Sequence, residues 1–169
     1  TLVAGGNDGR WGLYNSIRSN NILIQKAAEY SGNAKEIQEY VSAAHFFRAY
    51  NYFSLLQTFG GVPIVERPLS TNSAELRNPR NSRYEVVDFI LSDLKKAIEG
   101  LPVEQNIADD DKGHISRQAA KAFKARVLLY EATWRKYNGT STDFEGSAEP
   151  ARDQVNEFLE EAVVLAKEV

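Results

Sequence analysis

The sequence predicts an all-α fold in which antiparallel helical hairpins are joined by long loops. Five segments carry apolar residues at intervals of three and four positions, the spacing that places them on one face of a helix. Clusters of glycine, proline, serine and asparagine separate these segments. With 169 residues, 43% of them hydrophobic and 25% charged, the chain is long enough to bury one core. We therefore expect residues 1–169 to form a single helical domain.

The first helix is expected from about Arg10 to Tyr30. Residues 1–9 contain three glycines and an Asn-Asp pair, which are typical of a loop. Ser31-Gly32-Asn33 ends the helix. Its predicted inner face has positions three or four residues apart, namely Tyr14, Ile17, Asn21 and Ile24.

The second helix, from about Lys35 to Phe59, is the most apolar part of the chain and is expected at its centre. Gly60-Gly61 can adopt the left-handed conformation that closes a helix, and Pro63 cannot continue one. A short extended segment, Val62 to Val65, follows. Apolar residues form an arc that covers about half the circumference of this helix, and Phe47 and Leu55 lie outside it. The residues of the arc are Phe46, Ala49, Tyr50, Tyr52, Phe53, Leu56 and Phe59. Such a helix needs neighbours on several sides.

A polar surface loop and a third helix come next. Glu66 to Asn81 is rich in proline, serine and asparagine, and therefore favours a loop. Ser82 and Glu85 have the spacing of a capping box, in which each side chain binds a free backbone N–H group of the other. The helix should stop before Pro102. Its apolar positions are Val86, Val87, Ile90, Leu94, Ala97, Ile98 and Leu101.

Two further helices complete the chain. Ile107 to Gly113 forms an acidic loop, and Ser116 is the expected N-cap of the fourth helix, which should reach Trp134 or Tyr137. Tyr137 to Glu149 is predicted to be a second long loop. The last helix should start at Pro150. We expect one apolar face of it to lack a partner, formed by Val155, Phe158, Leu159, Ala162, Val163 and Ala166.

The second and fourth helices repeat one pattern at an offset of 76 residues, since Ala43-x-x-x-Phe47-Arg48-Ala49 matches Ala119-x-x-x-Phe123-Lys124-Ala125. A small residue four positions before an aromatic one lets paired helices approach closely, as in tetratricopeptide (TPR) repeats. The sequence thus predicts TPR-like hairpins and an α–α superhelix, in which the last helix begins a third hairpin. Arg48 could clamp an anion, but a structural ion pair or a snorkelling side chain is the better interpretation.

Several chemistries find no support in the sequence. The net charge of −3 and the lack of a long basic run argue against nucleic acid as a partner. There are no cysteines and only two histidines, His45 and His114, without metal-ligand spacing. Ala108 to Gly113 departs from a calcium loop in its glycine position and lacks the closing glutamate. Motifs for a serine nucleophile or a phosphate cradle are missing, so we expect no catalytic residue, metal or cofactor, and no enzyme.

Four segments in one order carry a resemblance to a known family. They are WGLYNSIRSNN (residues 11–21), FFRAYNYFSLLQTFGGVPIV (46–65), RYEVVDFILSDLKKAIEGLP (83–102) and GHISRQAAKAFKARVLLYEA (113–132). Together they resemble the SusD/RagB-like family of outer-membrane nutrient-binding lipoproteins. Ala43 stands where that family often has glutamate, and His114 where it often has arginine.

The resemblance implies a non-enzymatic function. It implies binding of glycans or other nutrients on the outward face of the outer membrane, for import through a SusC-like TonB-dependent transporter. The chain would be the N-terminal, TPR-like part of a larger protein, whose lipid anchor lies upstream and provides its only membrane attachment. The alternative is a TPR-like module that recognises a protein or peptide. The long loops favour the first interpretation, because a bare helical array does not need them.

The candidate ligand site lies just before the first helix, at Asn7, Asp8, Arg10 and Trp11. Sugar pockets combine hydrogen-bonding groups with an aromatic surface, because hydroxyl groups must be paired and the C–H faces of the ring covered. Asn7, Asp8 and Arg10 supply the former, and Trp11 the latter. Trp134 offers a second flat apolar side chain.

Overall fold

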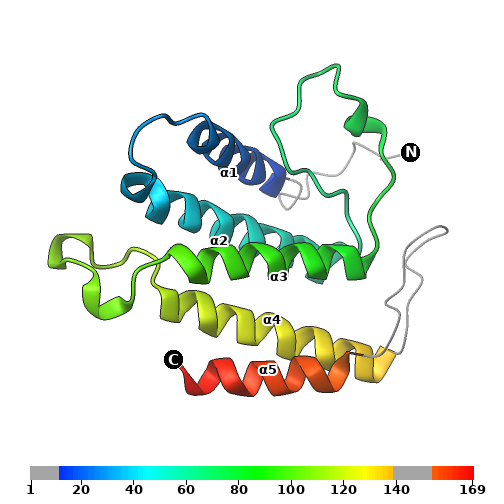
Figure 1. Ribbon diagram of the computed structural model, residues 1–169. Helices are drawn as coiled ribbons and strands as arrows, with labels where there is room; N and C mark the ends of the chain where they lie inside the picture. Colours follow the sequence, from blue (N-terminus) through cyan, green and yellow to red (C-terminus); the bar gives the residue numbers. More distant parts are fainter. Residues whose placement is uncertain (1–11, 139–153) are drawn as a thin grey trace.

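The computed structural model describes residues 12–138 and 154–169, and within them the chain forms a stack of antiparallel α-helices (Figure 1). Each helix packs on the one that follows it in the chain. This arrangement confirms the predicted all-α fold of helical hairpins. The helices are α1 (Leu13–Ala28), α2 (Ala34–Phe59), α3 (Arg83–Gly100), α4 (Arg117–Asn138) and α5 (Val155–Lys167).

The central helix α2 ends as its sequence predicts. Gly60 is its C-cap with φ 68° and ψ −125°, a conformation that costs a residue with a side chain much more than it costs glycine. Gly61 permits the next segment to pass closely, since a Cβ atom there would lie 2.1 Å from the carbonyl oxygen of Asn81. The two glycines therefore terminate α2 and let the chain turn back along it.

The predicted apolar arc of α2 is correct in part. Phe46, Tyr52 and Leu56 are buried, but Leu55, placed outside the arc, is fully buried, and Tyr50, placed inside it, is 49% exposed. The difference arises because α1 and α3 both pack on α2 and α4 contributes a ring as well. A helix with neighbours on several sides buries more than one stripe.

Aromatic contacts join α4 to α2, and Phe123 on α4 makes three of them. The Phe123 ring on α4 packs against Phe46 and Phe53 with ring centroids 5.5 Å apart in both pairs, and against Tyr50 at 5.3 Å. The contacts with Phe46 and Phe53 are edge-to-face, a geometry that adds to the free energy of burial. Phe123 is the aromatic residue of the repeated pattern, whereas its counterpart Phe47 is 49% exposed. The repeated pattern therefore predicted two similar helices. It did not predict that Phe123 packs against a neighbouring helix while Phe47 is largely exposed.

The capping box of α3 is formed as predicted. The hydroxyl of Ser82 accepts from the Glu85 backbone N–H, and the Glu85 carboxylate accepts from the Ser82 N–H at 2.7 Å. The hydrogen bond from the Ser82 N–H is the main reason why the pKa of Glu85 lies below its ordinary value. Partial burial has a smaller effect in the opposite direction.

Replacing this cap should destabilise the protein measurably. We expect Ser82→Ala to lower the free energy of unfolding by about 1 kcal/mol, because the half-buried Glu85 N–H loses its acceptor. Ser92→Ala, on the exposed side of the same helix, serves as the control and should be neutral or slightly stabilising. Urea unfolding of both variants measures the difference. Equal midpoints would show that the cap contributes nothing to stability.

The predicted loops contain short helical turns. A 3₁₀ turn, Ala74–Arg77, interrupts the segment between α2 and α3, and two more, Glu104–Asn106 and Asp109–Asp111, lie between α3 and α4. The Ser116 hydroxyl accepts from the Ala119 N–H at 3.2 Å, as expected of the N-cap of α4. The predicted loop after Tyr137 and the predicted helix start at Pro150 fall within residues 139–153, outside the described part.

The prediction that the apolar face of α5 lacks a partner is wrong for three of its residues. Val155, Phe158 and Ala162 are buried because α5 packs along α4. Two ion pairs border this contact, Lys121–Glu168 at 2.8 Å and Lys124–Glu161 at 2.6 Å. Val163 stays 53% exposed, as predicted. From the sequence we expected a sixth helix to cover the apolar face of α5, whereas α4 covers most of it.

No helix in the described ranges is both long enough and apolar enough to cross a membrane.

Candidate functional site

The four residues predicted to bind ligand lie outside the described residues. Asn7, Asp8, Arg10 and Trp11 directly precede α1 in the chain, so the first turn of that helix is the nearest described structure. A cleft opens beside this turn.

The cleft lies between α1 and the segment that joins α2 to α3, which rises beside α1 in Figure 1. Its volume is about 390 Å³, within the range of small-molecule sites. The apolar part of its wall consists of Ile17, Pro63, Val65, Leu69 and Leu76. The polar groups around it are Tyr14, Asn15, Arg18, Arg67, Glu75 and Asn78.

Hydrogen bonds from α1 and α2 hold the wall of the cleft. Asn21 donates its amide to the Val65 carbonyl at 2.8 Å, and the Val65 N–H donates to the Tyr52 hydroxyl at the same distance. Tyr14 donates its hydroxyl to the Pro63 carbonyl at 2.7 Å, and Arg18 donates to the Leu69 carbonyl, also at 2.7 Å. The extended segment thus bonds several of its backbone groups to helix side chains, while Asn81, just before α3, accepts from the Ile64 N–H and donates its own N–H to the Val62 carbonyl.

Burial raises the pKa of two tyrosines, Tyr14 in the wall of the cleft and Tyr52 behind that wall. It raises the pKa of Tyr14 far above its ordinary value, with a smaller contribution from the neighbouring Tyr52. It raises the pKa of Tyr52 to about 12, although the hydrogen bond at Val65 opposes the shift. A tyrosine is protonated at neutral pH even without these shifts, so the Tyr14 hydroxyl can donate to the Pro63 carbonyl.

Behind the wall lies a buried ion pair between α2 and α3. Arg48 donates Nε to Asp93 Oδ2 at 2.7 Å and Nη2 to Asp93 Oδ1 at 2.8 Å. The third nitrogen, Nη1, donates to Asn21 Oδ1 at 2.7 Å, and His45 Nδ1 lies 2.8 Å from Asp93 Oδ1. These contacts confirm the structural interpretation of Arg48. They also orient Asn21, so that its amide group reaches Val65.

The charge of Asp93 is maintained despite its burial. Burial alone would raise the pKa of this carboxyl group, but the hydrogen bonds from Arg48 and His45 outweigh that effect and lower it below the ordinary value. Asp93 is therefore ionised at neutral pH and holds the Arg48 guanidinium in one orientation.

The cleft has groups for non-covalent binding of a polar ring. Arg67 and Glu75 form an ion pair at its mouth. In the ranges 12–138 and 154–169 no group of three or more histidine, cysteine or acidic side chains could hold a metal ion. The geometry combines an apolar wall with hydrogen-bonding groups around it, the composition expected of a ligand pocket.

Sequence reasoning missed this cleft, although one signal pointed to it. Asn21 was assigned to the inner face of the first helix, and an asparagine among buried apolar residues needs hydrogen-bond partners. Val65 and Arg48 are those partners. The other tryptophan considered as a flat ligand surface, Trp134, is half-buried, and the Arg83 guanidinium lies over one face of its ring at 3.9 Å.

Comparisons with known proteins agree with one another. A SusD-like family model described as "Starch-binding associating with outer membrane" matches residues 8–129. A curated SusD-like protein of Formosa agariphila is 31% identical over 135 residues, which are 80% of this chain and 25% of that protein. The chain therefore spans about a quarter of the length of this relative.

Solved structures show the same helical arrangement. A SusD-like protein from Bacteroides fragilis is 32% identical, with a TM-score of 0.69 over 76% of this chain and 25% of that one. A structure described as a laminarin-binding SusD-like protein is 29% identical, with a TM-score of 0.65 over 80% of this chain and 31% of the other. The fold and the sequence thus point to one group of proteins.

Proposed function

This chain belongs to the SusD-like family, and from that premise we propose that it takes part in non-covalent glycan binding at the outer membrane. In this proposal it acts as a binding protein and not as an enzyme. The family description names starch binding and association with the outer membrane, and one solved relative is described as laminarin-binding.

We also propose that residues 1–169 are a single helical domain of a larger, outward-facing lipoprotein. The support is the length of the relatives, of which this chain spans about a quarter. In the larger protein, a SusC-like TonB-dependent transporter would receive the bound glycan for import. The transporter and the import role rest on the sequence resemblance, whereas the family description supports the association with the outer membrane.

The observation that carries glycan binding is the cleft beside α1. A sugar ring has two apolar C–H faces and a belt of hydroxyl groups, so its pocket needs an apolar surface with hydrogen-bonding groups around it. The leucine side chains Leu69 and Leu76 can cover a ring face, while Asn15 and Asn78 offer donors and acceptors. Asn7, Asp8, Arg10 and Trp11 remain proposed ligand contacts, supported by their position directly before the first turn of α1.

A leucine pair in this chain permits a matched test. Leu76 lines the cleft and is 55% exposed, whereas Leu129 on α4 is 52% exposed and does not line it. We expect Leu76→Ala to weaken glycan binding by about 1 kcal/mol, roughly five-fold in Kd, because apolar contact with the sugar is lost. Leu129→Ala should leave the affinity unchanged.

The measurement is calorimetric titration of the complete protein with malto- and laminari-oligosaccharides, with the melting temperature followed in parallel. Equal effects of the two leucine variants would remove the cleft from the proposal. If neither glycan bound, and a peptide library did, the protein-recognition alternative would replace it.

A specific observation favours that alternative: three aromatic side chains of α2 are about half exposed or more, Tyr40 at 62% and both Phe47 and Tyr50 at 49%.

A further inference from the structure

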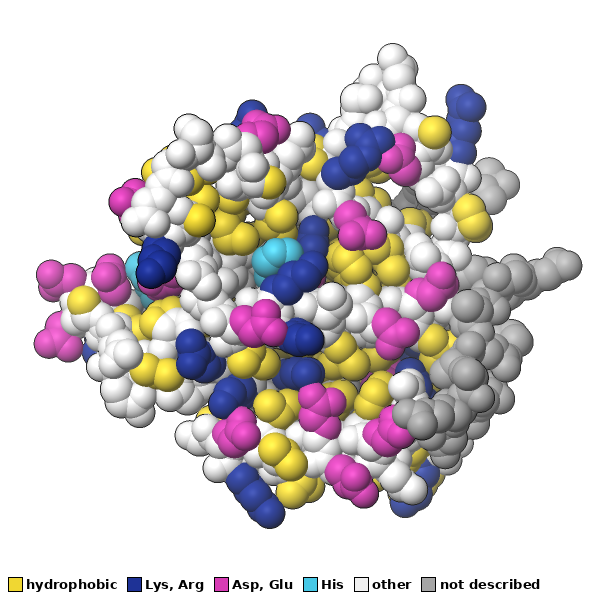
Figure 2. All heavy atoms as spheres, viewed as in Figure 1, with side chains coloured by type: hydrophobic (Ala, Val, Ile, Leu, Met, Phe, Trp, Pro, Cys, Tyr) yellow, Lys and Arg dark blue, Asp and Glu magenta, His cyan; other side chains and the backbone are white. Residues whose placement is uncertain are grey.

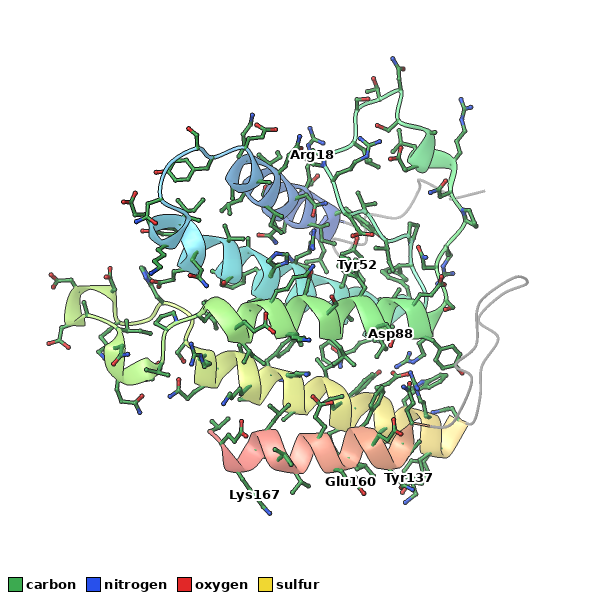
Figure 3. All side chains as sticks on the ribbon, in the orientation of Figure 1. Arg18, Tyr52, Asp88, Tyr137, Glu160 and Lys167 are labelled. Carbon is green, nitrogen blue, oxygen red and sulfur yellow. The ribbon has the colours of Figure 1, made fainter. Side chains whose placement is uncertain are left out.

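Arg18 is the charged residue of the cleft whose guanidinium group keeps unused N–H donors. It lies on α1 and projects toward the segment between α2 and α3 (Figure 3). One nitrogen, Nη1, donates to the Leu69 carbonyl at 2.7 Å. A guanidinium group has five N–H donors in a planar fork, so this bond orients the group and leaves most of its donors unused. Among the described residues, no carboxylate forms an ion pair with Arg18.

The other charges of the cleft neutralise each other. Arg67 and Glu75 both line the cleft and form an ion pair with each other. Of the residues in the described part of the chain, two arginines and one glutamate line the cleft, which leaves one positive charge, that of Arg18. The whole chain carries a net charge of −3, and Figure 2 shows charged side chains of both signs interspersed over the visible face. The cleft is therefore locally positive on a protein that is negative overall.

The surroundings of Arg18 strengthen its attraction for an anion. Arg18 itself is exposed, but Ile17, Val65 and Leu69 line the cleft beside it, and a charge–charge interaction is stronger on the side where apolar groups displace water. Arginine matches planar or trigonal oxyanions, because two parallel N–H groups can bind two oxygens of one acid group. The hydrogen bond to the Leu69 carbonyl does not require a charged donor, since a neutral amide could also form it.

We infer that the glycan bound in this cleft is anionic, with a uronate carboxylate or a sulfate ester held by the free donors of Arg18. The inference rests on the proposed function and specifies the ligand class of the same site. The apolar wall then covers the face of the sugar ring while Arg18 binds its acid group. Neutral glucans of similar length become weaker ligands of this cleft.

The test compares each anionic sugar with its own neutral form. The probes are oligogalacturonate and its carboxyl-reduced counterpart, and a sulfated galactan oligosaccharide and its desulfated counterpart. Calorimetric titration of the complete protein at low salt should show that at least one anionic form binds about ten-fold or more tightly than its counterpart. The two pairs distinguish a carboxylate from a sulfate. The preference should decrease as salt screens the interaction.

Three variants distinguish the effect of the Arg18 charge from the effect of its hydrogen bond to the Leu69 carbonyl. Arg18→Gln keeps a donor for the Leu69 carbonyl and should abolish the preference for the anionic form, with little effect on the neutral form. Arg18→Lys keeps the charge without the fork, and should retain part of the preference. Arg126→Gln makes the same charge change on an exposed part of α4 and should have no effect.

The possible outcomes distinguish the two levels of the proposal. If neutral and anionic forms bound equally well and both were weakened by Leu76→Ala, glycan binding would stand and the anionic ligand would be refuted. The same refutation follows if Arg18→Gln weakened both forms equally, because Arg18 would then only hold Leu69 in place. If none of the sugars bound, glycan binding by this cleft would fail together with the inference.

Discussion

Glu131→Gln should destabilise the protein by about 3–5 kcal/mol, because the side chain it replaces neutralises two buried arginines. Glu131 lies on α4 and is 0% exposed. Its Oε2 accepts from Arg83 Nη2 at 2.7 Å and Nε at 2.9 Å, and its Oε1 accepts from Arg135 Nε at 2.8 Å. The glutamine has nearly the same volume, so the loss reflects charge and hydrogen bonding and not a cavity.

Aromatic rings enclose the same cluster and increase the cost of leaving its charges unpaired. The Arg83 guanidinium lies over the Trp134 ring at 3.9 Å, and the Arg135 guanidinium lies between Tyr84 at 4.8 Å and Phe158 at 4.9 Å. These rings come from α3, α4 and α5, so the cluster joins the last three helices. Cation–π contacts add to the attraction but cannot replace a carboxylate.

Urea unfolding at pH 7 measures the effect of Glu131→Gln. Glu161→Gln is the matched control, since it breaks an ion pair between α4 and α5 whose glutamate side chain is 44% exposed. The control should cost less than about 1 kcal/mol. A similar loss in both variants would mean that burial of the Glu131 cluster adds nothing to its contribution.

Asp93→Asn is expected to cost a similar amount, about 3–5 kcal/mol at pH 7, and the cost should depend on pH. Asp93 is 0% exposed, and its carboxylate is the counter-ion of the buried Arg48. Its pKa lies below the ordinary value of about 3.9 for an aspartate in an unfolded chain. Protonation therefore favours the unfolded state. The contribution of Asp93 is complete above the unfolded-state pKa and is lost as the pH falls through the folded-state pKa.

The difference in unfolding free energy between the protein with Asp93 and the Asp93→Asn variant isolates this titration. We expect a large difference at pH 5 to 7 that shrinks as the pH falls below about 4. A difference that stayed constant down to pH 3 would contradict a carboxylate with a lowered pKa.

The same variant should loosen the cleft, because Arg48 links Asp93 to Asn21 and Asn21 holds Val65. Hydrogen exchange at the amides of residues 64–66 should therefore be faster in Asp93→Asn. In Glu131→Gln, which breaks the other buried cluster, it should be unchanged at a temperature where both variants are folded.

Local features of the fold could be predicted from sequence because their causes are local. The capping box at Ser82, the N-cap at Ser116 and the helix end at Gly60 each depend on residues within about four positions of one another. Helical periodicity placed Ile17 and Asn21 on one inner face for the same reason. The family resemblance also extended over most of the chain, and it implied the glycan-binding proposal before any geometry was known.

The tertiary structure decided which polar groups meet. Arg48 and Asp93 are 45 residues apart, Asn21 and Val65 are 44 apart, and Arg83 and Glu131 are 48 apart. No periodicity within one helix specifies which residue of another helix will face it, because that depends on how the helices cross and where each begins. The cleft beside α1 arises in the same way, from a loop that folds back over a helix. For this protein, short-range backbone preferences therefore determined the helices and their ends, whereas the packing of helices distant in sequence determined the ion pairs and the candidate site.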